Sequence, residues 1–317
     1  MDEAIRFWDR EQRDPVHSTW LDEPRIRRYV NAAVSGDPEV WPVPWLAGEL
    51  ARRFPGRLFD RGLSIGCGAG GLERDLLRHD VCRAIDAFDG SVAALAAARR
   101  SAAEAGCGAR ARYYAADFNR PALPAATYDV VFFHQSLHHV AYLEKLLSAV
   151  LRSLKANGVL YLDEYVGPSR FDWSPQRMAP FRALYETLPA DCRRVSELPR
   201  PIVPEDPSEA IRSAEIERYV GLGFDVLLRR PYGGTLLSMV HPFVAFERAP
   251  ADLVEHLIES ERRLLASGYP SFYAVLLCRP KRGPARRWAR SRYFLDPKLR
   301  RLAKELRERW RPPGRRP

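Results

Sequence analysis

The stretch Gly62-Leu63-Ser64-Ile65-Gly66-Cys67-Gly68-Ala69-Gly70-Gly71-Leu72-Glu73 decides how the rest of the chain is interpreted. A short apolar run enters a cluster of glycines, and a helical pattern of leucines leaves it. Such a turn lets backbone amides approach a ligand closely, because glycine has no Cβ. Gly66, Gly68 and Gly71 also fit the dinucleotide pattern G-x-G-x-x-G, so the turn alone leaves the identity of the ligand open.

Strands and helices alternate after this turn. The sequence predicts strands over residues 82–88, 111–115, 128–133 and 159–166, and helices over 72–78, 94–105 and 143–154, the last closed by Asn157-Gly158. The run 128–133 is mostly apolar, which is typical of a strand buried on both faces. The alternation therefore indicates βαβ units and a parallel sheet.

The regular alternation ends after residue 166. Aromatic residues and prolines are frequent over 168–205. Asp206-Pro207-Ser208-Glu209 then carries the signal of a helix start, and we expect a helix from there to Val220. Two late strands are predicted over 224–229 and 271–278, with a helix over 251–266 between them.

Residues 1–58 are rich in Trp, Pro and Arg and predict two or three short helices ahead of the sheet. These helices could cover a ligand site, with Trp8, Trp20, Tyr29 and Trp41 as the side chains that face it. Alternatively, the aromatic side chains only anchor an N-terminal arm on the domain. For each of the four residues taken singly, we favour this alternative.

Five segments, in order over residues 63–166, resemble the class I S-adenosylmethionine-dependent methyltransferase family. They are Gly66-x-Gly68-x-Gly70, Asp89-x-Ser91, Asp117-Phe118, the run from Tyr128 to Val140 and the run from Leu154 to Leu160. The resemblance implies an α/β fold: a seven-stranded, mostly parallel, Rossmann-like sheet with helices on both faces and an antiparallel last strand. It also implies a helical lid or arm (1–58), a methyltransferase domain (59–280) with acceptor-pocket insertions at about 168–222 and 232–270, and a tail (281–317).

The cofactor that this resemblance implies is S-adenosyl-L-methionine. The residues expected to bind it are Gly66, Cys67, Gly68, Gly70, Asp89, Gly90, Asp117, Phe118, His134 and Gln135. The family usually has an acidic residue two positions before the first glycine of the turn, where this chain has Ser64. Part of the contact with the methionine moiety is therefore expected to come from elsewhere.

Asp89 also has an argument of its own. It follows Gly66 by 23 positions at a strand end, where a carboxylate can accept hydrogen bonds from both ribose hydroxyls. The alternative is that Asp89 only caps the following helix. Asp117 could accept from the adenine amino group with Phe118 packed on the ring, or it could belong to an ordinary polar loop. Cys67 is interpreted as a small residue that the turn requires, not as a nucleophile.

Methyl transfer to a hydroxyl needs alignment of the acceptor and removal of a proton. The candidates for this chemistry are His138, His139, His134 and Glu164, and those for acceptor binding are Tyr165, Trp173 and Arg212. Histidine titrates near neutral pH, which suits a general base. Alternatively, Leu-His-His is only a packing signature of the family, and Arg212 only forms a surface ion pair with Glu209. We expect no metal, since no cluster of carboxylates and histidines is evident in the sequence.

The net charge of +10 lies almost wholly in the tail, where fifteen Lys or Arg residues after position 280 stand against three acidic ones. Leucines at helical spacing, Leu295, Leu299, Leu302 and Leu306 followed by Trp310, predict a basic amphipathic helix there. This helix could dock on the body or on a partner subunit, which we favour, or contact an anionic membrane or RNA. The nearly neutral body does not indicate a nucleic-acid-binding surface.

The five scattered cysteines and the lack of a signal-peptide pattern predict a cytoplasmic protein. We expect methyl transfer to oxygen of a small-molecule or glycan-type acceptor. The alternatives are an RNA methyltransferase that uses the tail, an NAD-dependent oxidoreductase, and a catalytically silent cofactor-binding protein. The sequence indicates no oligomeric state.

Overall fold

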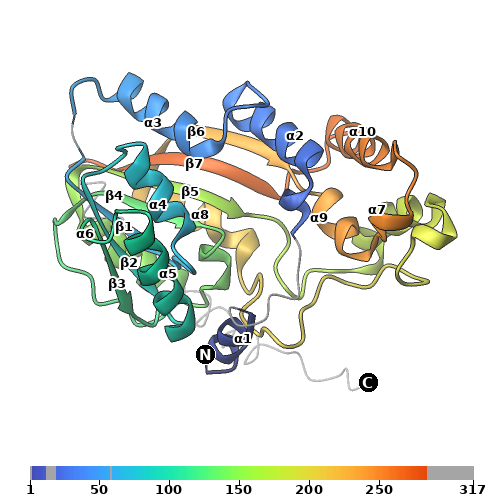
Figure 1. The fold of residues 1–317 in the computed structure, drawn as a ribbon, viewed down its shortest axis with the longest axis horizontal. Helices are drawn as coiled ribbons and strands as arrows, with labels where there is room; N and C mark the ends of the chain where they lie inside the picture. Colours follow the sequence, from blue (N-terminus) through green and yellow to red (C-terminus); the bar gives the residue numbers. More distant parts are fainter. Residues whose placement is uncertain (1, 12–18, 58, 284–317) are drawn as a thin grey trace, which may run out of the picture.

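The computed structural model describes residues 2–11, 19–57 and 59–283 (Figure 1). A seven-stranded sheet with the order β3-β2-β1-β4-β5-β7-β6 organises these residues. The strands are β1 (Arg61–Ile65), β2 (Ala84–Asp89), β3 (Ala111–Ala115), β4 (Tyr128–His134), β5 (Leu154–Tyr165), β6 (Phe224–Gly233) and β7 (Tyr273–Pro280). The first five are parallel, whereas β7 is antiparallel to both of its neighbours. The predicted fold class is confirmed.

Ten α-helices and six short 3-10 helices connect the strands within the described residues. The α-helices are α1 (Asp2–Glu11), α2 (Pro24–Ser35), α3 (Pro42–Arg53), α4 (Gly71–Arg78), α5 (Val92–Glu104), α6 (Leu143–Ser153), α7 (Pro175–Thr187), α8 (Ile216–Gly223), α9 (Leu237–Val240) and α10 (Leu253–Ala266). The 3-10 helices are η1 (Trp20–Asp22), η2 (Leu137–His139), η3 (Ala190–Cys192), η4 (Ser213–Glu215), η5 (His241–Phe243) and η6 (Phe246–Arg248).

Strand alternation divides the core into two layers. Val130 and Phe132 of β4 join the buried cluster that includes residues of α2, α3, α4 and α5. Val131 and Phe133 join the cluster formed with α6 and α8 on the other face. Because successive side chains of a strand point to opposite faces, a strand covered on both sides is apolar throughout.

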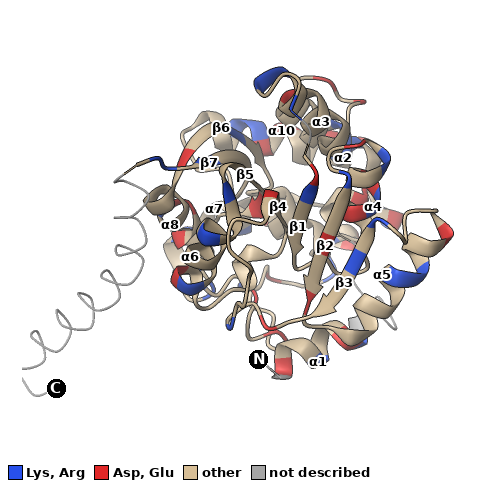
Figure 2. Ribbon diagram, turned by 90° about the vertical axis from the view of Figure 1, so that its left-hand side faces the viewer, with Lys and Arg blue, Asp and Glu red and all other residues tan. Residues whose placement is uncertain are grey.

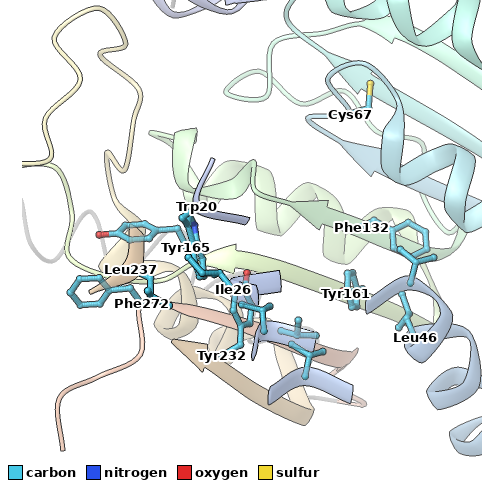
Figure 3. Close-up of a cluster of buried hydrophobic side chains, with 14 of the residues drawn as sticks. Trp20, Ile26, Leu46, Cys67, Phe132, Tyr161, Tyr165, Tyr232, Leu237 and Phe272 are labelled. Atoms are coloured by element: carbon cyan, nitrogen blue, oxygen red, sulfur yellow. The ribbon is translucent and has the colours of Figure 1, made fainter. Parts of the chain in front are cut away.

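An aromatic cluster joins the late segments to the first of these layers. Trp173 contacts Phe181 and Phe272 edge-on, with ring centroids 6.3 and 5.9 Å apart. Trp20 stacks on Tyr232 at 6.4 Å and is buried there (Figure 3). Trp20 is therefore an anchor of the N-terminal segment, in accordance with the favoured alternative.

Two predicted helix boundaries are wrong. α6 ends at Ser153, and Asn157-Gly158 lies inside β5 instead of closing the helix. Asp206 does not start a helix: its Oδ1 accepts hydrogen bonds from the N and Oγ of Ser208, which makes a local turn, and α8 begins only at Ile216. In the second case a local hydrogen bond of the Asp206 side chain competes with the helix start.

All five cysteines are buried and unpaired. Across the described ranges, no helix combines the length and the apolar character that crossing a bilayer requires. The amphipathic helix predicted around Leu295 to Trp310 lies outside the described residues.

Candidate functional site

A cavity of about 640 Å³ lies at the carboxyl ends of the parallel strands. Parallel α/β sheets bind ligands at this edge, and the volume is typical of a ligand pocket. Helix α1 lies across the ends of β2 and β3 and contributes one wall (Figure 2). The lining residues are Ala4, Ile5, Trp8, Gly66, Gly68, Asp89, Gly90, Ser91, Ala94, Ala116, Asp117, Phe118, Asn119, Arg120, Gln135, Ser136, His139, Ala141, Tyr142, Lys145, Pro207, Ser208 and Ile211.

The glycine turn after β1 forms the floor of the cavity. Gly66 has a φ of +77°, and a Cβ there would lie 2.3 Å from the Cβ of Ser136. Ser136 in turn donates a hydrogen bond to the carbonyl of Ile65. Gly68 has a φ of +50° and faces open space. Gly66 therefore permits close packing of β1 against the β4 loop, and Gly68 leaves room for a ligand.

Asp89 lies at the end of β2 between this turn and the cavity. Its Oδ2 accepts a hydrogen bond from Gly68 N and its Oδ1 from Ser91 N, each at 2.8 Å. Burial raises the pKa of Asp89, although the backbone hydrogen bonds oppose this shift. The helix-cap role belongs to Ser91, whose Oγ accepts from Ala94 N. Asp89 thus keeps carboxylate lone pairs for a ligand in the cavity.

Asp117 and Phe118 line the cavity after β3. Asp117 Oδ1 accepts a hydrogen bond from Asn119 N at 2.8 Å, so a local turn fixes the loop. Phe118 lies close to the turn, 3.6 Å from the position that a Cβ of Gly66 would take. The two residues offer an acceptor and a ring face beside each other.

Cys67 and Gly70 do not line this cavity, although the sequence placed them among the binding residues. Burial raises the pKa of the Cys67 thiol far above its usual range, which keeps it neutral. Gly70 has a φ of +75°, and a Cβ there would lie 2.8 Å from Tyr113 Oη. Both residues support the shape of the turn, and their contact with a cofactor stays a prediction.

Helix α1 is docked by Asp9, a residue that the sequence did not single out. Asp9 Oδ1 accepts hydrogen bonds from Ser91 Oγ at 2.5 Å and from Ala93 N at 3.2 Å. The carboxylate thus caps the start of α5 from outside. Of the four aromatic residues expected to face a ligand, Trp8 alone lines the large cavity among the described side chains.

Gln135 and His134 diverge at the end of β4. Gln135 has a φ of +51° and lines the large cavity. His134 lines a second cavity of about 230 Å³ together with Trp41 and Asp163 and does not line the large cavity. Burial alone would lower the pKa of His134, but Asp163, with its Oδ2 at 3.2 Å from His134 Nδ1, raises it above its usual value.

Glu164 is fully buried and cannot contact an acceptor. Its Oε1 accepts hydrogen bonds from Ser136 N and Leu137 N at 2.7 and 2.6 Å. Its Oε2 lies 2.8 Å from His138 Nδ1. The carboxylate of Glu164, a candidate for the chemistry, thus closes the turn into η2 and fixes the His138 ring.

His139 is the predicted catalytic residue that lines the large cavity. Its Nδ1 lies 3.1 Å from Ser208 Oγ, and the ring of Trp8 contacts it edge-on at 5.4 Å. Burial and the neighbouring His138 lower the pKa of His139. His138 is only 6% exposed and lies behind it. Burial alone would lower the pKa of His138, but the charges of Glu209 and Glu164 raise it.

The three residues expected to bind the acceptor have other roles. Tyr165 is buried and donates a hydrogen bond to the carbonyl of Pro168. Trp173 lies in the aromatic cluster described above. Arg212 makes two hydrogen bonds to the carboxylate of Glu144, at 2.9 and 2.8 Å, and pairs with Glu215 instead of Glu209. These side chains hold the late segments in place.

Glu73 of α4 is an acidic residue close to Ser64, but it does not line the large cavity. Its carboxyl group is fully buried near Ser64, without a well-formed hydrogen bond to any described residue. Burial raises the pKa of Glu73 to about 7, with Ser64 and His134 acting in the opposite direction. No pattern in the sequence indicates this burial, since a glutamate in an amphipathic helix is usually exposed.

Residues 63–162 match the model of a protein family described as a methyltransferase domain. The chain is 27% identical over 113 residues to a sterol 24-C-methyltransferase of Eremothecium gossypii, which covers 36% of the chain and 30% of that protein. It is 33% identical over 114 residues to a malonyl-[acyl-carrier protein] O-methyltransferase of Enterobacter lignolyticus. This match covers 36% of the chain and 42% of that protein. The chain therefore spans less than half the length of these curated relatives.

A solved structure shares the fold over most of the chain. It is a geranyl diphosphate C-methyltransferase from Streptomyces coelicolor in complex with Mg²⁺, geranyl diphosphate and S-adenosyl-L-homocysteine. The match has a TM-score of 0.51 at 16% identity and covers 88% of this chain and 98% of the other. At this identity the likeness concerns the fold alone.

Proposed function

We propose, from the premise that residues 63–162 form a class I S-adenosylmethionine-dependent methyltransferase domain, that this protein methylates a hydroxyl group of a small-molecule or glycan-type acceptor. The observation that carries the proposal is the position of Asp89, which faces a cavity of about 640 Å³ while it holds the glycine turn at Gly68. A carboxylate beside close-approaching backbone is the arrangement that suits a nucleoside.

The donor set fits the cofactor of this domain. Asp89 can accept from ribose hydroxyls, and Asp117 with Phe118 can take a base in the same cavity. The open space at Gly68 removes a side chain that would compete with the ligand. S-adenosyl-L-methionine, when bound, supplies an electrophilic methyl group on a charged sulfur. The protein's own task is then to bind, orient and keep water out.

The acceptor is proposed to enter beside η2. Trp8 and Ile211 supply apolar surface there, and His139 supplies a ring nitrogen close to it. Tyr142 and Lys145 also line the cavity, and their polar groups suit an acceptor with several hydroxyls. We therefore place His139 as the residue that faces the acceptor, with His138 and Glu164 behind it as positioning residues.

The proposed location and partners follow from the cysteines and the distribution of charge. Five unpaired cysteines favour a reducing compartment such as the cytoplasm. Nucleic acid is not expected as a partner of the body. Membrane contact through the C-terminal helix stays a prediction, since residues 284–317 lie outside the described ones.

Calorimetry and labelling test the proposal. S-adenosylhomocysteine should bind and NAD should not, whereas the reverse would contradict it. Isotope-labelled methyl groups should then appear in a small hydroxylated molecule when the protein is incubated with metabolite fractions, as detected by mass spectrometry. Transfer to RNA with a steep salt dependence would support the RNA alternative. Cofactor binding without transfer to any fraction would indicate a catalytically silent protein.

A further inference from the structure

Two adjacent histidines of η2 direct ring nitrogens toward one carboxylate. The Nε2 atoms of His138 and His139 lie 3.9 and 3.7 Å from Glu209 Oε2. These distances are too long for hydrogen bonds. One ligating atom from each of the three residues nevertheless lies within 4.8 Å of the other two. Two imidazole nitrogens and one carboxylate oxygen are a common ligand set for a divalent transition metal.

The Nδ1 atoms of both histidines already have hydrogen-bond partners. His138 Nδ1 lies 2.8 Å from the buried carboxylate of Glu164, which has no exposed surface. His139 Nδ1 lies 3.1 Å from Ser208 Oγ, and Ser208 donates to Asp206. A proton on each Nδ1 satisfies these partners and leaves the lone pair of each Nε2 free. Metal-binding histidines are usually oriented by such partners of the second nitrogen.

Asp206 provides a separate indication. It is only 1% exposed, and its Oδ2 has no hydrogen-bond partner among the described residues. That oxygen lies 3.4 Å from His139 Nδ1. An unpaired buried carboxylate is costly unless positive charge lies nearby. A cation bound at the imidazoles would supply that charge.

The backbone fixes the distance between the two parts of the cluster. Ile211 N donates a hydrogen bond to the carbonyl of His138 at 3.1 Å. This bond ties the segment that carries Glu209 to η2. The turn at Asp206, which replaces the expected helix, brings Glu209 to the histidines. Ligand atoms on a tetrahedral zinc ion lie about 3.4 Å apart, so small side-chain movements would complete the site.

We propose that His138, His139 and Glu209 bind a divalent transition-metal ion of the zinc type, with a fourth position open to the acceptor side of the cavity. His139 and Ser208 line that cavity, and Trp8 covers the His139 ring. This proposal differs from our expectation of a protein without a metal site. The residues involved lie about 70 positions apart in the chain, so no spacing motif could indicate them.

The chemical role of the ion rests on the proposed methyl transfer. An acceptor hydroxyl at the fourth position would lose its proton to solvent more readily, because the cation stabilises the resulting alkoxide. That oxygen then forms a bond to the methyl carbon while the carbon–sulfur bond breaks and its electrons return to sulfur. His139 would act as a ligand in this reaction, not as the base.

Cobalt(II) binding to the chelator-treated, full-length protein tests the site without cofactor or acceptor. We expect saturable one-to-one binding with visible absorption bands, which added Zn²⁺ abolishes by displacement. Glu164→Gln should weaken binding by roughly 10- to 100-fold, because it loosens the His138 ring. Glu209→Gln, which removes a ligand charge, should weaken it further. Glu205→Gln is the matched control: an exposed glutamate in the same segment, with no expected effect.

Two results would overturn the proposal: no saturable cobalt binding by the wild-type protein, or equal binding by Glu209→Gln. Glu209 is 30% exposed at its side chain, so its replacement should leave the fold intact, which thermal unfolding will check. Calorimetry with S-adenosylhomocysteine separates this inference from the proposed function. Binding of that ligand by a protein that does not bind cobalt would leave the methyltransferase proposal standing and remove the metal.

Discussion

Asp89 combines two contacts that usually belong to different residues. It holds the glycine turn through Gly68 N and the start of α5 through Ser91 N, and it also lines the cavity. Its bonds within the protein therefore prepare it for a ligand, because they fix the carboxylate before anything binds.

Asp89→Ala should weaken S-adenosylhomocysteine binding by roughly 1–3 kcal/mol, the usual range for lost hydrogen bonds to a charged group. Titration calorimetry measures the change. Asp225→Ala is the control. Asp225 lies on β6, at the distant edge of the sheet, and its side chain pairs with Arg279. Unchanged affinity in Asp89→Ala would reject the ribose role.

Glu73 makes stability depend on pH. Its pKa is about 7 in the folded protein against an ordinary value of 4.5. The folded state therefore keeps a proton that the unfolded chain has lost, and the free energy of unfolding should fall between pH 4.5 and 7, by about 3 kcal/mol from this group.

Glu73→Gln should remove this dependence. The variant is expected to unfold at higher urea concentration than the wild type at pH 8, and at a similar concentration at pH 4. Glu104→Gln, which changes an exposed glutamate of α5, should match the wild type at both values. If the difference in stability between the wild type and the Glu73 variant is the same at pH 4 and pH 8, the carboxyl group is ionised and paired in the folded protein.

Residues with a fixed spacing from the glycine turn were predictable from the sequence. Gly66, Asp89 and Asp117 each lie at the end of a strand or within two residues after it, and strand ends of a parallel sheet meet at one edge. The roles of residues that depend on a partner far away in the sequence could not be predicted. Arg212 was expected in the acceptor site, but Glu144, 68 positions away, takes its guanidinium.

Helix α1 forms one wall of the cavity. Ile5 and Trp8 line it, and Asp9 connects it to the first turn of α5. The contacts of α1 with the rest of the chain are few compared with those of α2, which packs on β6 and α10. Opening of α1 should therefore cost little free energy.

Asp9→Ala should loosen this helix without unfolding the sheet, because it removes two hydrogen bonds at the start of α5. We expect faster hydrogen exchange over residues 2–11 and faster dissociation of S-adenosylhomocysteine in stopped-flow experiments. Glu3→Ala, at an exposed position of the same helix, should leave both rates unchanged. Slow exchange in the Asp9 variant would mean that Ile5 and Trp8 alone hold α1.

The elements of the central sheet could be predicted because apolar strands alternate with amphipathic helices of suitable length. The structure of segment 206–215 could not be predicted. Asp206 stands in a sequence typical of a helix N-cap, but its carboxylate accepts hydrogen bonds from Ser208 instead. The sequence of this segment is compatible with both a helix and a turn. The hydrogen bond from Ile211 N to the carbonyl of His138 favours the turn.

At the scale of the whole molecule, the late segments share the core of the sheet. Phe272 contacts Trp173, Phe181 and Tyr165, which lie in separate parts of the sequence. We infer that the sheet and these segments unfold as one cooperative unit, because neither layer can keep its apolar surface buried without the other.

Phe272→Ala should lower the free energy of unfolding by about 3–5 kcal/mol, as expected for removal of a buried aromatic ring. Tryptophan fluorescence and far-ultraviolet circular dichroism should report one coincident transition in urea. Phe171→Ala is the control, since that ring is 78% exposed. Two separated transitions in the wild-type protein would show that the late segments form an independent unit.

The five buried thiols give the molecule a set of internal reporters. Cys67 sits in the cofactor turn, Cys82 and Cys107 lie under the first layer, Cys192 follows α7, and Cys278 lies in β7. An electrophilic dye can modify each sulfur only while its surroundings are open. The order in which mass spectrometry finds them alkylated would therefore map the sequence of local openings without a single engineered label, and ligands that tighten the turn should delay Cys67 alone.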